Sequence, residues 1–244
     1  MTGEYSDLGS RLRLNEEKYC DMYSTAFKQP FQDALKSISE ETKNTIDKSH
    51  MMVSQVQSKF LKDLVAMLRP NRVLEIGGFT GYSAVAMASA LRPNSKITSL
   101  ELEEKHIEVA RRHVASANIQ NLIEFRQGPA LESLHELAKE KVQYDFIFMD
   151  ADKGGYVRYF DAIMEHDMLS EQGVLLVDNV LFFGQVHKLV PECNVTKDTY
   201  AEGSKNTKKM AAKVHHFNEH VANDSRVECT ILPIFDGITV IRKK

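Results

Sequence analysis

Oxygen-bearing side chains follow two apolar runs in the second half of the sequence. Asp150 comes directly after the run 146–149, and Asp178 and Asn179 come directly after the run 174–177. If the runs are strands of one parallel sheet, their carboxyl ends face the same crevice. Two carboxylates and one amide oxygen are hard ligands that suit Mg²⁺, Ca²⁺ or Mn²⁺. The pattern thus predicts a cation site, with helix capping or solvated loops as the alternative.

A lysine lies close to the first of these acids. Lys153 stands three positions after Asp150. Beside a bound cation the pKa of a lysine is expected to fall, and the amine could then act as a general base. The alternative is an ordinary surface lysine.

A glycine-rich turn follows an earlier apolar run. The segment 75–83 reads EIGGFTGYS, and an acid, Glu101, ends the next run about twenty residues beyond Gly81. Glycines allow a tight turn near a ligand, a following helix presents free N–H groups, and an acid at this place can accept both hydroxyls of a ribose. The pair predicts an adenosine-type cofactor. The alternatives are a turn shaped by geometry alone and an acid that opens a helix.

The spacing bears on which cofactor this is. The pattern is G-x-x-x-G, from Gly77 to Gly81, with Glu75 two positions before it, rather than G-x-G-x-x-G. Together with the terminal hairpin described below, this favours S-adenosylmethionine over a nicotinamide dinucleotide. A nicotinamide-dependent oxidoreductase remains the alternative at this point.

The elements that position these residues follow an alternating pattern. Short apolar runs alternate with helix-like stretches, which is typical of βαβ units and a parallel sheet with helices on both faces. The last two runs flank the short turn 235–237, so the sheet is expected to end with an antiparallel edge strand. Residues 15–69 read as helices, with Leu61 and Val65 on one apolar face and Pro70 ending the last. The seven runs are 73–76, 97–100, 122–125, 146–149, 174–177, 227–232 and 238–241.

Bulk properties restrict the class of protein. The 244 residues suit one α/β domain spanning 1–244, with a helical cover over about 1–69. The formal net charge of −3 gives no general attraction to nucleic acid or to an anionic membrane. No apolar run is long enough to span a bilayer, and the N-terminus has no signal-peptide core. Three scattered cysteines imply no disulfide framework, so we expect a cytoplasmic protein.

Taken together, the motifs resemble the cation-dependent O-methyltransferases, the family of caffeoyl-CoA and catechol O-methyltransferases. The resemblance runs from about residue 50 to the end, and the Asp-Ala-Asp-Lys and Asp-Asn-Val signals are its specific part. The matching segments are 51–54 (MMVS), 75–83 (EIGGFTGYS), 128–131 (GPAL), 148–153 (FMDADK), 178–181 (DNVL) and 236–238 (DGI).

The resemblance implies a Rossmann-like S-adenosylmethionine-dependent methyltransferase fold, with a mostly parallel seven-stranded sheet and an antiparallel terminal strand. It implies that Asp150, Asp178 and Asn179 hold a divalent cation, with Mg²⁺ as the expected ion, and that Lys153 is the catalytic base. The acceptor would be a catechol-like small molecule, for example a caffeoyl-type phenylpropanoid or a flavonoid, and the family implies a homodimer. Implied cofactor-binding residues are Val53, Glu75, Gly77, Gly78, Ser83, Glu101, Ala130 and Asp152.

Three departures from the family pattern lie where an acceptor would be chosen. The sequence has 57–59 (QSK) in place of an acid or glutamine followed by Gly-Gln, Phe182 in place of tryptophan, and a long segment from 185 to 204. We therefore expect Phe182 to Ser204, with the N-terminal helices, to form the acceptor pocket. The alternatives for the whole chain are a nucleic-acid or protein methyltransferase, an NAD(P)-dependent oxidoreductase and a non-catalytic interaction protein.

A histidine pair stands outside these motifs. His216 and His220 lie one helical turn apart, a spacing that can bind zinc. Because the sequence offers no cysteine or acid at ligand spacing, we interpret the pair as a solvated helix face.

Overall fold

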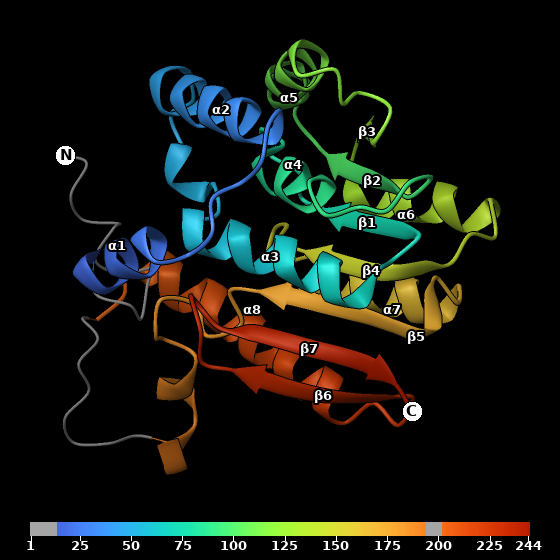
Figure 1. The fold of residues 1–244 in the computed structure, drawn as a ribbon. Helices are drawn as coiled ribbons and strands as arrows, with labels where there is room; N and C mark the ends of the chain where they lie inside the picture. Colours follow the sequence, from blue (N-terminus) through green and yellow to red (C-terminus); the bar gives the residue numbers. More distant parts are fainter. Residues whose placement is uncertain (1–13, 194–201) are drawn as a thin grey trace.

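Seven strands of the described residues form one sheet in the order β3-β2-β1-β4-β5-β7-β6 (Figure 1). The computed structural model describes residues 14–193 and 202–244. The five strands from β1 to β5 run parallel to one another, and β7 runs antiparallel to both β5 and β6. The strands are β1 (Arg72–Ile76), β2 (Lys96–Glu101), β3 (Ile123–Gln127), β4 (Tyr144–Met149), β5 (Leu169–Asp178), β6 (Val227–Leu232) and β7 (Ile238–Lys243).

The central strands have continuous apolar runs because both faces of the sheet are covered. In β4 the four residues from Phe146 to Met149 are all buried. Such runs are typical of parallel strands between two helical layers. The prediction of an α/β fold with a mostly parallel seven-stranded sheet is therefore confirmed.

Helices cover the two faces as separate layers (Figure 1). On one face, Leu61 of α3 and Val85 of α4 share a core with Phe146 and Phe148 of β4. On the other face, residues of α6, α7 and α8 share a core with alternate residues of the same strands. The helices are α1 (Leu14–Met22), α2 (Phe31–Thr45), α3 (Gln55–Leu68), α4 (Tyr82–Ala88), α5 (Glu104–Ser116), α6 (Ala130–Lys139), α7 (Tyr156–Glu165) and α8 (Lys205–Ala222).

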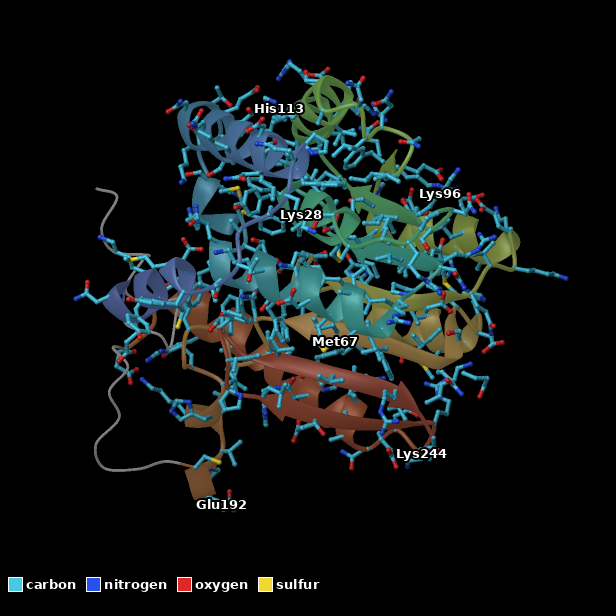
Figure 2. All side chains as sticks on the ribbon, in the orientation of Figure 1. Lys28, Met67, Lys96, His113, Glu192 and Lys244 are labelled. Carbon is cyan, nitrogen blue, oxygen red and sulfur yellow. The ribbon has the colours of Figure 1, made fainter. Side chains whose placement is uncertain are left out.

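The third helix begins and ends at recognisable signals. Ser54 caps it, with its side-chain oxygen accepting from the Gln57 backbone N–H at 3.3 Å. Arg69 follows in the left-handed conformation, and Pro70 then prevents continuation, as predicted. Leu61 and Val65 are fully buried, whereas Met67 lies on the outer face of the helix (Figure 2).

The predicted terminal hairpin is present, and the sheet ends with an antiparallel pair of strands. The antiparallel strand β7 lies between β5 and β6, so β6 is the edge strand of this end of the sheet. A hairpin signal predicts that two strands pair with each other, but it does not say which of them pairs with the rest of the sheet. Within the described ranges, no helix is long and apolar enough to cross a membrane. All three cysteines of the sequence are free.

Candidate functional site

The carboxyl ends of the central strands meet at one edge of the sheet. In register, Ile76 of β1 pairs with Leu100 of β2 and with Met149 of β4, and Met149 in turn pairs with Val177 of β5. The backbone N–H of Asp150 donates to the carbonyl of Ile76 at 2.9 Å. The predicted cofactor residues after β1 and β2 and the predicted cation ligands after β4 and β5 therefore lie side by side on one edge of the sheet.

The glycine turn after β1 is in direct contact with the start of the acidic segment. Gly77 has φ +99°, and a Cβ at this position would lie 2.3 Å from the carbonyl oxygen of Asp150. Gly81 has φ +82° and opens α4, where a Cβ would lie 2.7 Å from the Cβ of Ala110. Both positions require glycine, because an L side chain would strain the backbone and meet atoms that cannot move. The turn therefore packs closely against the segment after β4 and against α5.

Glu75 is a fully buried carboxyl group beneath this turn. Ser83 and Ser99 each donate a hydroxyl hydrogen bond of 2.5 Å, to Oε1 and Oε2 respectively. Burial raises the pKa of Glu75 to about 7, although the two serines act in the opposite direction. A Cβ on Gly78 would lie 3.3 Å from Glu75 Oε2. Gly78 and Ser83 therefore both lie directly beside the Glu75 carboxyl group.

Glu101 ends β2 with its carboxylate held in place. Its Oε2 accepts from the Phe79 backbone N–H at 2.8 Å, and its Oε1 accepts from the Glu103 N–H at 3.0 Å. His106 Nδ1 lies 3.0 Å from the same Oε1. A carboxylate has about four acceptor positions, so this group still has capacity to accept a hydroxyl. The arrangement suits an oriented acceptor for a ribose.

The other predicted cofactor residues lie around the same edge. Val53 lies just before α3 and is half-buried, and Ala130 is the first residue of α6. Asp152, in the turn before α7, accepts a short hydrogen bond from the hydroxyl of Tyr159. Contact between these residues and a cofactor stays a prediction.

Lys153 is bound to two partners within the predicted cation site. Its Nζ donates to Asp150 Oδ1 at 2.8 Å and to the Tyr156 hydroxyl oxygen at 2.7 Å. The Tyr156 hydroxyl donates in turn to the backbone carbonyl of Asp178 at 3.0 Å. Burial alone would lower the pKa of Lys153, but the charge and hydrogen bond of Asp150, together with Tyr156 and Asp178, outweigh burial and hold the pKa above its usual value. Without a cation this lysine is therefore charged.

Asp178 is almost completely buried at the end of β5. Its Oδ2 accepts from Gln57 Nε2 at 2.6 Å and its Oδ1 from the Asn179 backbone N–H at 2.7 Å. Burial, and secondly the charge of Asp150, raise the pKa of Asp178 to about 7. A bound cation would stabilise the ionised forms of two neighbouring carboxylates, and oxygen donors suit a hard divalent cation. These residues therefore fit the implied ion.

Two further side chains that contact these ligands were not predicted from the sequence as part of the site. Gln57 was interpreted as part of a departure near the acceptor, yet its side chain bonds to Asp178. Asp236 was identified only as part of the hairpin turn and of the family-like segment 236–238, yet Asn179 Nδ2 donates to its Oδ2 at 3.3 Å. The available signals were a glutamine two positions inside α3 and an acid in the turn of the terminal hairpin.

The predicted acceptor segment lies only partly within the described residues. Residues 194–201 lie outside them. Before this gap, the rings of Phe182 and Phe183 are in contact, with centroids 4.9 Å apart. Across it, Gln185 Oε1 accepts from the Gly203 N–H at 3.0 Å, which joins the two ends of the segment. Its contact with an acceptor stays a prediction.

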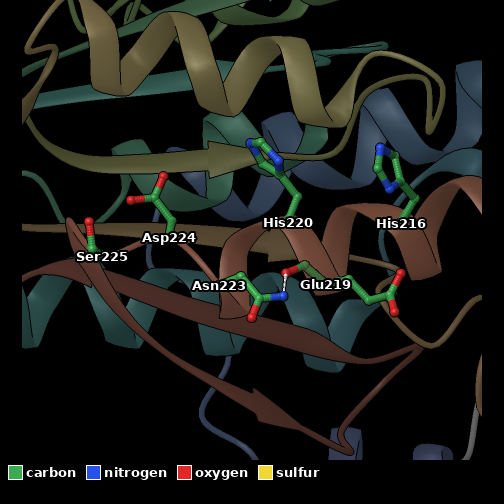
Figure 3. A pocket seen from close by; sticks show the side chains of 6 residues that line it. All are labelled: His216, Glu219, His220, Asn223, Asp224 and Ser225. Atoms are coloured by element: carbon green, nitrogen blue, oxygen red, sulfur yellow. Dashed lines mark hydrogen bonds between the residues drawn. The ribbon is translucent and has the colours of Figure 1, made fainter.

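A surface hollow of about 620 Å³ lies away from this edge (Figure 3). His216 and His220 of α8 line it, together with residues that follow the helix. Asp161 of α7 reaches His220, with Oδ1 2.7 Å from Nε2. Among the described residues, no group of three or more histidine, cysteine or acidic side chains is arranged to hold a metal. The hollow therefore does not change the assignment of the site.

Comparison with known proteins gives a consistent result. A family model described as O-methyltransferase matches residues 25–244. The chain is 29% identical to a caffeoyl-CoA O-methyltransferase of Medicago sativa, covering 99% of this chain and 95% of that protein. It is 29% identical to the SAH-bound methyltransferase PaMTH1 of Podospora anserina, with a TM-score of 0.81 over 97% of this chain and 99% of that one. It is 26% identical to the O-methyltransferase TomG of Streptomyces achromogenes in complex with SAM. The TM-score is 0.76, and the match covers 93% of this chain and 95% of that one.

Proposed function

The chain belongs to the O-methyltransferase family, and from this premise we propose that it methylates one hydroxyl of a catechol-like small molecule with the help of a divalent cation. The methyl donor is S-adenosylmethionine, as in the relatives of this fold. One observation carries the proposal beyond the family. Asp150, Asp178 and Asn179 stand on adjacent strand ends, and Lys153 is bound to the first of them.

The binding roles divide between the two halves of the sheet edge. Glu101 would accept the ribose hydroxyls, while the backbone of Gly77 and Gly78 and the side chain of Ser83 would lie against the rest of the donor. Two adjacent hydroxyls, as in a vicinal diphenol, would reach the oxygen-rich half at Asp150 and Asp178. Holding both reactants in one geometry is the largest contribution that such a site makes to the rate.

The donor supplies an electrophilic methyl group, and the cation supplies positive charge that favours the ionised form of a nearby hydroxyl. Lys153 Nζ would accept the proton of that hydroxyl. It can do so once the charge of Asp150 is shared with a cation, because burial then acts to lower the pKa of the lysine. Tyr156 holds Nζ in place by accepting its second hydrogen bond, so the base stays at the sheet edge.

A panel of acceptors tests the proposal. Purified protein is incubated with methyl-labelled S-adenosylmethionine and Mg²⁺, and with either vicinal diphenols or their single-hydroxyl analogues. We expect label in the vicinal diphenols and little in the analogues, because only the former offer two adjacent oxygens. Equal labelling of both classes would contradict the proposed acceptor class.

A further inference from the structure

Two side chains outside the predicted ligand set touch two of the predicted ligands. Gln57 reaches Asp178 from α3, and Asp236 reaches Asn179 from the turn between β6 and β7. We propose that Gln57 and Asp236 are positioning residues that hold Asp178 and Asn179 in the orientation in which they bind a divalent cation. This inference rests on the proposed function, since it assumes that the sheet edge binds a cation.

The contact of Gln57 is buried on both sides. Gln57 is 6% exposed and Asp178 is 2% exposed, and their polar atoms are 2.6 Å apart. The second oxygen of the carboxylate accepts from the Asn179 backbone N–H at 2.7 Å. One donor on each oxygen fixes the plane of the carboxylate, and each oxygen keeps a further acceptor position. The carboxylate of Asp178 is thus oriented before any cation arrives.

Asp236 determines which end of the Asn179 amide faces the site. Its Oδ1 is held by the Phe183 backbone N–H at 2.7 Å, and its Oδ2 receives Asn179 Nδ2 at 3.3 Å. An amide nitrogen donates hydrogen bonds, and only the amide oxygen suits a hard cation. By binding the nitrogen, Asp236 leaves the oxygen of Asn179 for the cation.

The turn that carries Asp236 is itself fixed to the segment after β5. The Leu181 N–H donates to the Asp236 carbonyl at 3.0 Å, and the Val180 N–H donates to the Gly237 carbonyl at 3.1 Å. Gly237 has φ +88°, and a Cβ there would lie 2.8 Å from the Leu181 nitrogen. The turn is therefore held directly against the segment that follows Asn179, so Asp236 has a fixed place beside the amide.

Cation affinity is the property that separates positioning from general stability. Loss of a residue that orients metal ligands typically costs about 10–100-fold in metal affinity. Binding of Mn²⁺ to the full chain is measured by the electron paramagnetic resonance signal of the free ion, with and without saturating S-adenosylmethionine. The variants are Gln57→Met, which removes the donor, and Asp236→Asn, which keeps an acceptor for Phe183 but places a donor against Asn179.

Matched control variants exist on the same elements. Gln55→Met makes the same change at an exposed position of α3, and Glu228→Gln removes one exposed carboxylate from the hairpin that carries Asp236. We expect one Mn²⁺ to bind about 10–100-fold more weakly to the two test variants and with wild-type affinity to both controls. Affinity for S-adenosylmethionine and the unfolding midpoint serve as checks that the variants are folded.

An exchange variant covers the case in which Asp236→Asn disturbs the turn. Combining it with Asn179→Asp places an amide donor against a carboxylate again at unchanged total charge. We expect this double variant to recover at least wild-type affinity for Mn²⁺. A double variant as weak as Asp236→Asn alone would overturn the role of Asp236.

The remaining outcomes separate the inference from the proposed function. If the wild type binds Mn²⁺ and the test variants bind it equally well, the inference is overturned and the cation site remains. If the wild type shows no saturable binding, the cation dependence in the proposed function is wrong, and the inference is overturned with it.

Discussion

Replacing Glu75 by glutamine should change how the stability of the cofactor-free protein depends on pH. The side chain is fully buried, and its pKa is raised from the ordinary value of 4.5 to about 7. Between these two values the folded protein keeps a proton that the unfolded chain has lost. The contribution of protonated Glu75 to the free energy of unfolding is therefore fully present below pH 4.5, and it is lost as the pH rises through 7.

The magnitude follows from the two pKa values. The difference between about 7 and 4.5, at about 1.4 kcal/mol for each pKa unit, corresponds to about 3.5 kcal/mol. Glutamine has nearly the same shape and does not titrate; one of the Ser83 and Ser99 hydroxyls can rotate to accept from its amide nitrogen while the other still donates to its amide oxygen. The variant should therefore gain about 2–3 kcal/mol relative to the wild type between pH 5 and pH 8.

The assay is urea unfolding of both proteins at a series of pH values, without cofactor or cation. The difference between wild type and variant cancels most other titrating groups, and Glu228→Gln, an exposed change on β6, is the control and should show no pH-dependent difference. A difference for Glu75→Gln that stays constant from pH 5 to pH 8 would refute the reasoning, because it would mean that the buried carboxyl does not change its charge in this range.

Three further predictions concern the site itself. Glu101→Ala should weaken binding of S-adenosylmethionine by about 1–3 kcal/mol, because the ribose hydroxyls lose their acceptor at a partly buried position. Unchanged affinity in calorimetry of a folded variant would contradict this prediction. Lys153→Met should lower kcat by about 10²–10⁴-fold at neutral pH. This loss should become smaller as the pH rises, because the acceptor hydroxyl then ionises without a base. Equal single-turnover rates of variant and wild type at neutral pH would show that Lys153 is not the base. Grafting a shorter segment in place of 182–204 should change preference across a catechol panel and leave cofactor affinity unchanged; unaltered preference would rule out the segment as the acceptor pocket.

Local signals were sufficient to predict the sheet and the acids at its edge. A buried parallel strand is a short apolar run, and a polar residue directly after it must lie at the carboxyl end, where ligands bind in this class of fold. Asp150 and Asp178 satisfy both conditions within a few residues of sequence. Their convergence follows from strand order, which right-handed βαβ units largely determine.

Contacts between distant elements had no such local signal. Gln57 and Asp178 are 121 positions apart, and Asn179 and Asp236 are 57 positions apart. Which residue of α3 faces the end of β5 depends on the orientation of the helix about its own axis. The packing of its apolar side chains against the sheet determines that orientation. The insertion of β7 between β5 and β6 likewise depends on which hairpin strand fits the exposed edge of β5.

Removal and return of the cation tests the central claim most directly. Protein is stripped with a chelator and dialysed, and initial rates of methyl transfer to a vicinal diphenol are measured with saturating S-adenosylmethionine while Mg²⁺ is added back. Because Asp150, Asp178 and Asn179 offer only oxygen ligands, we expect the stripped protein to be inactive and Mg²⁺ to restore the rate with saturation. Full turnover after exhaustive chelation would contradict the account.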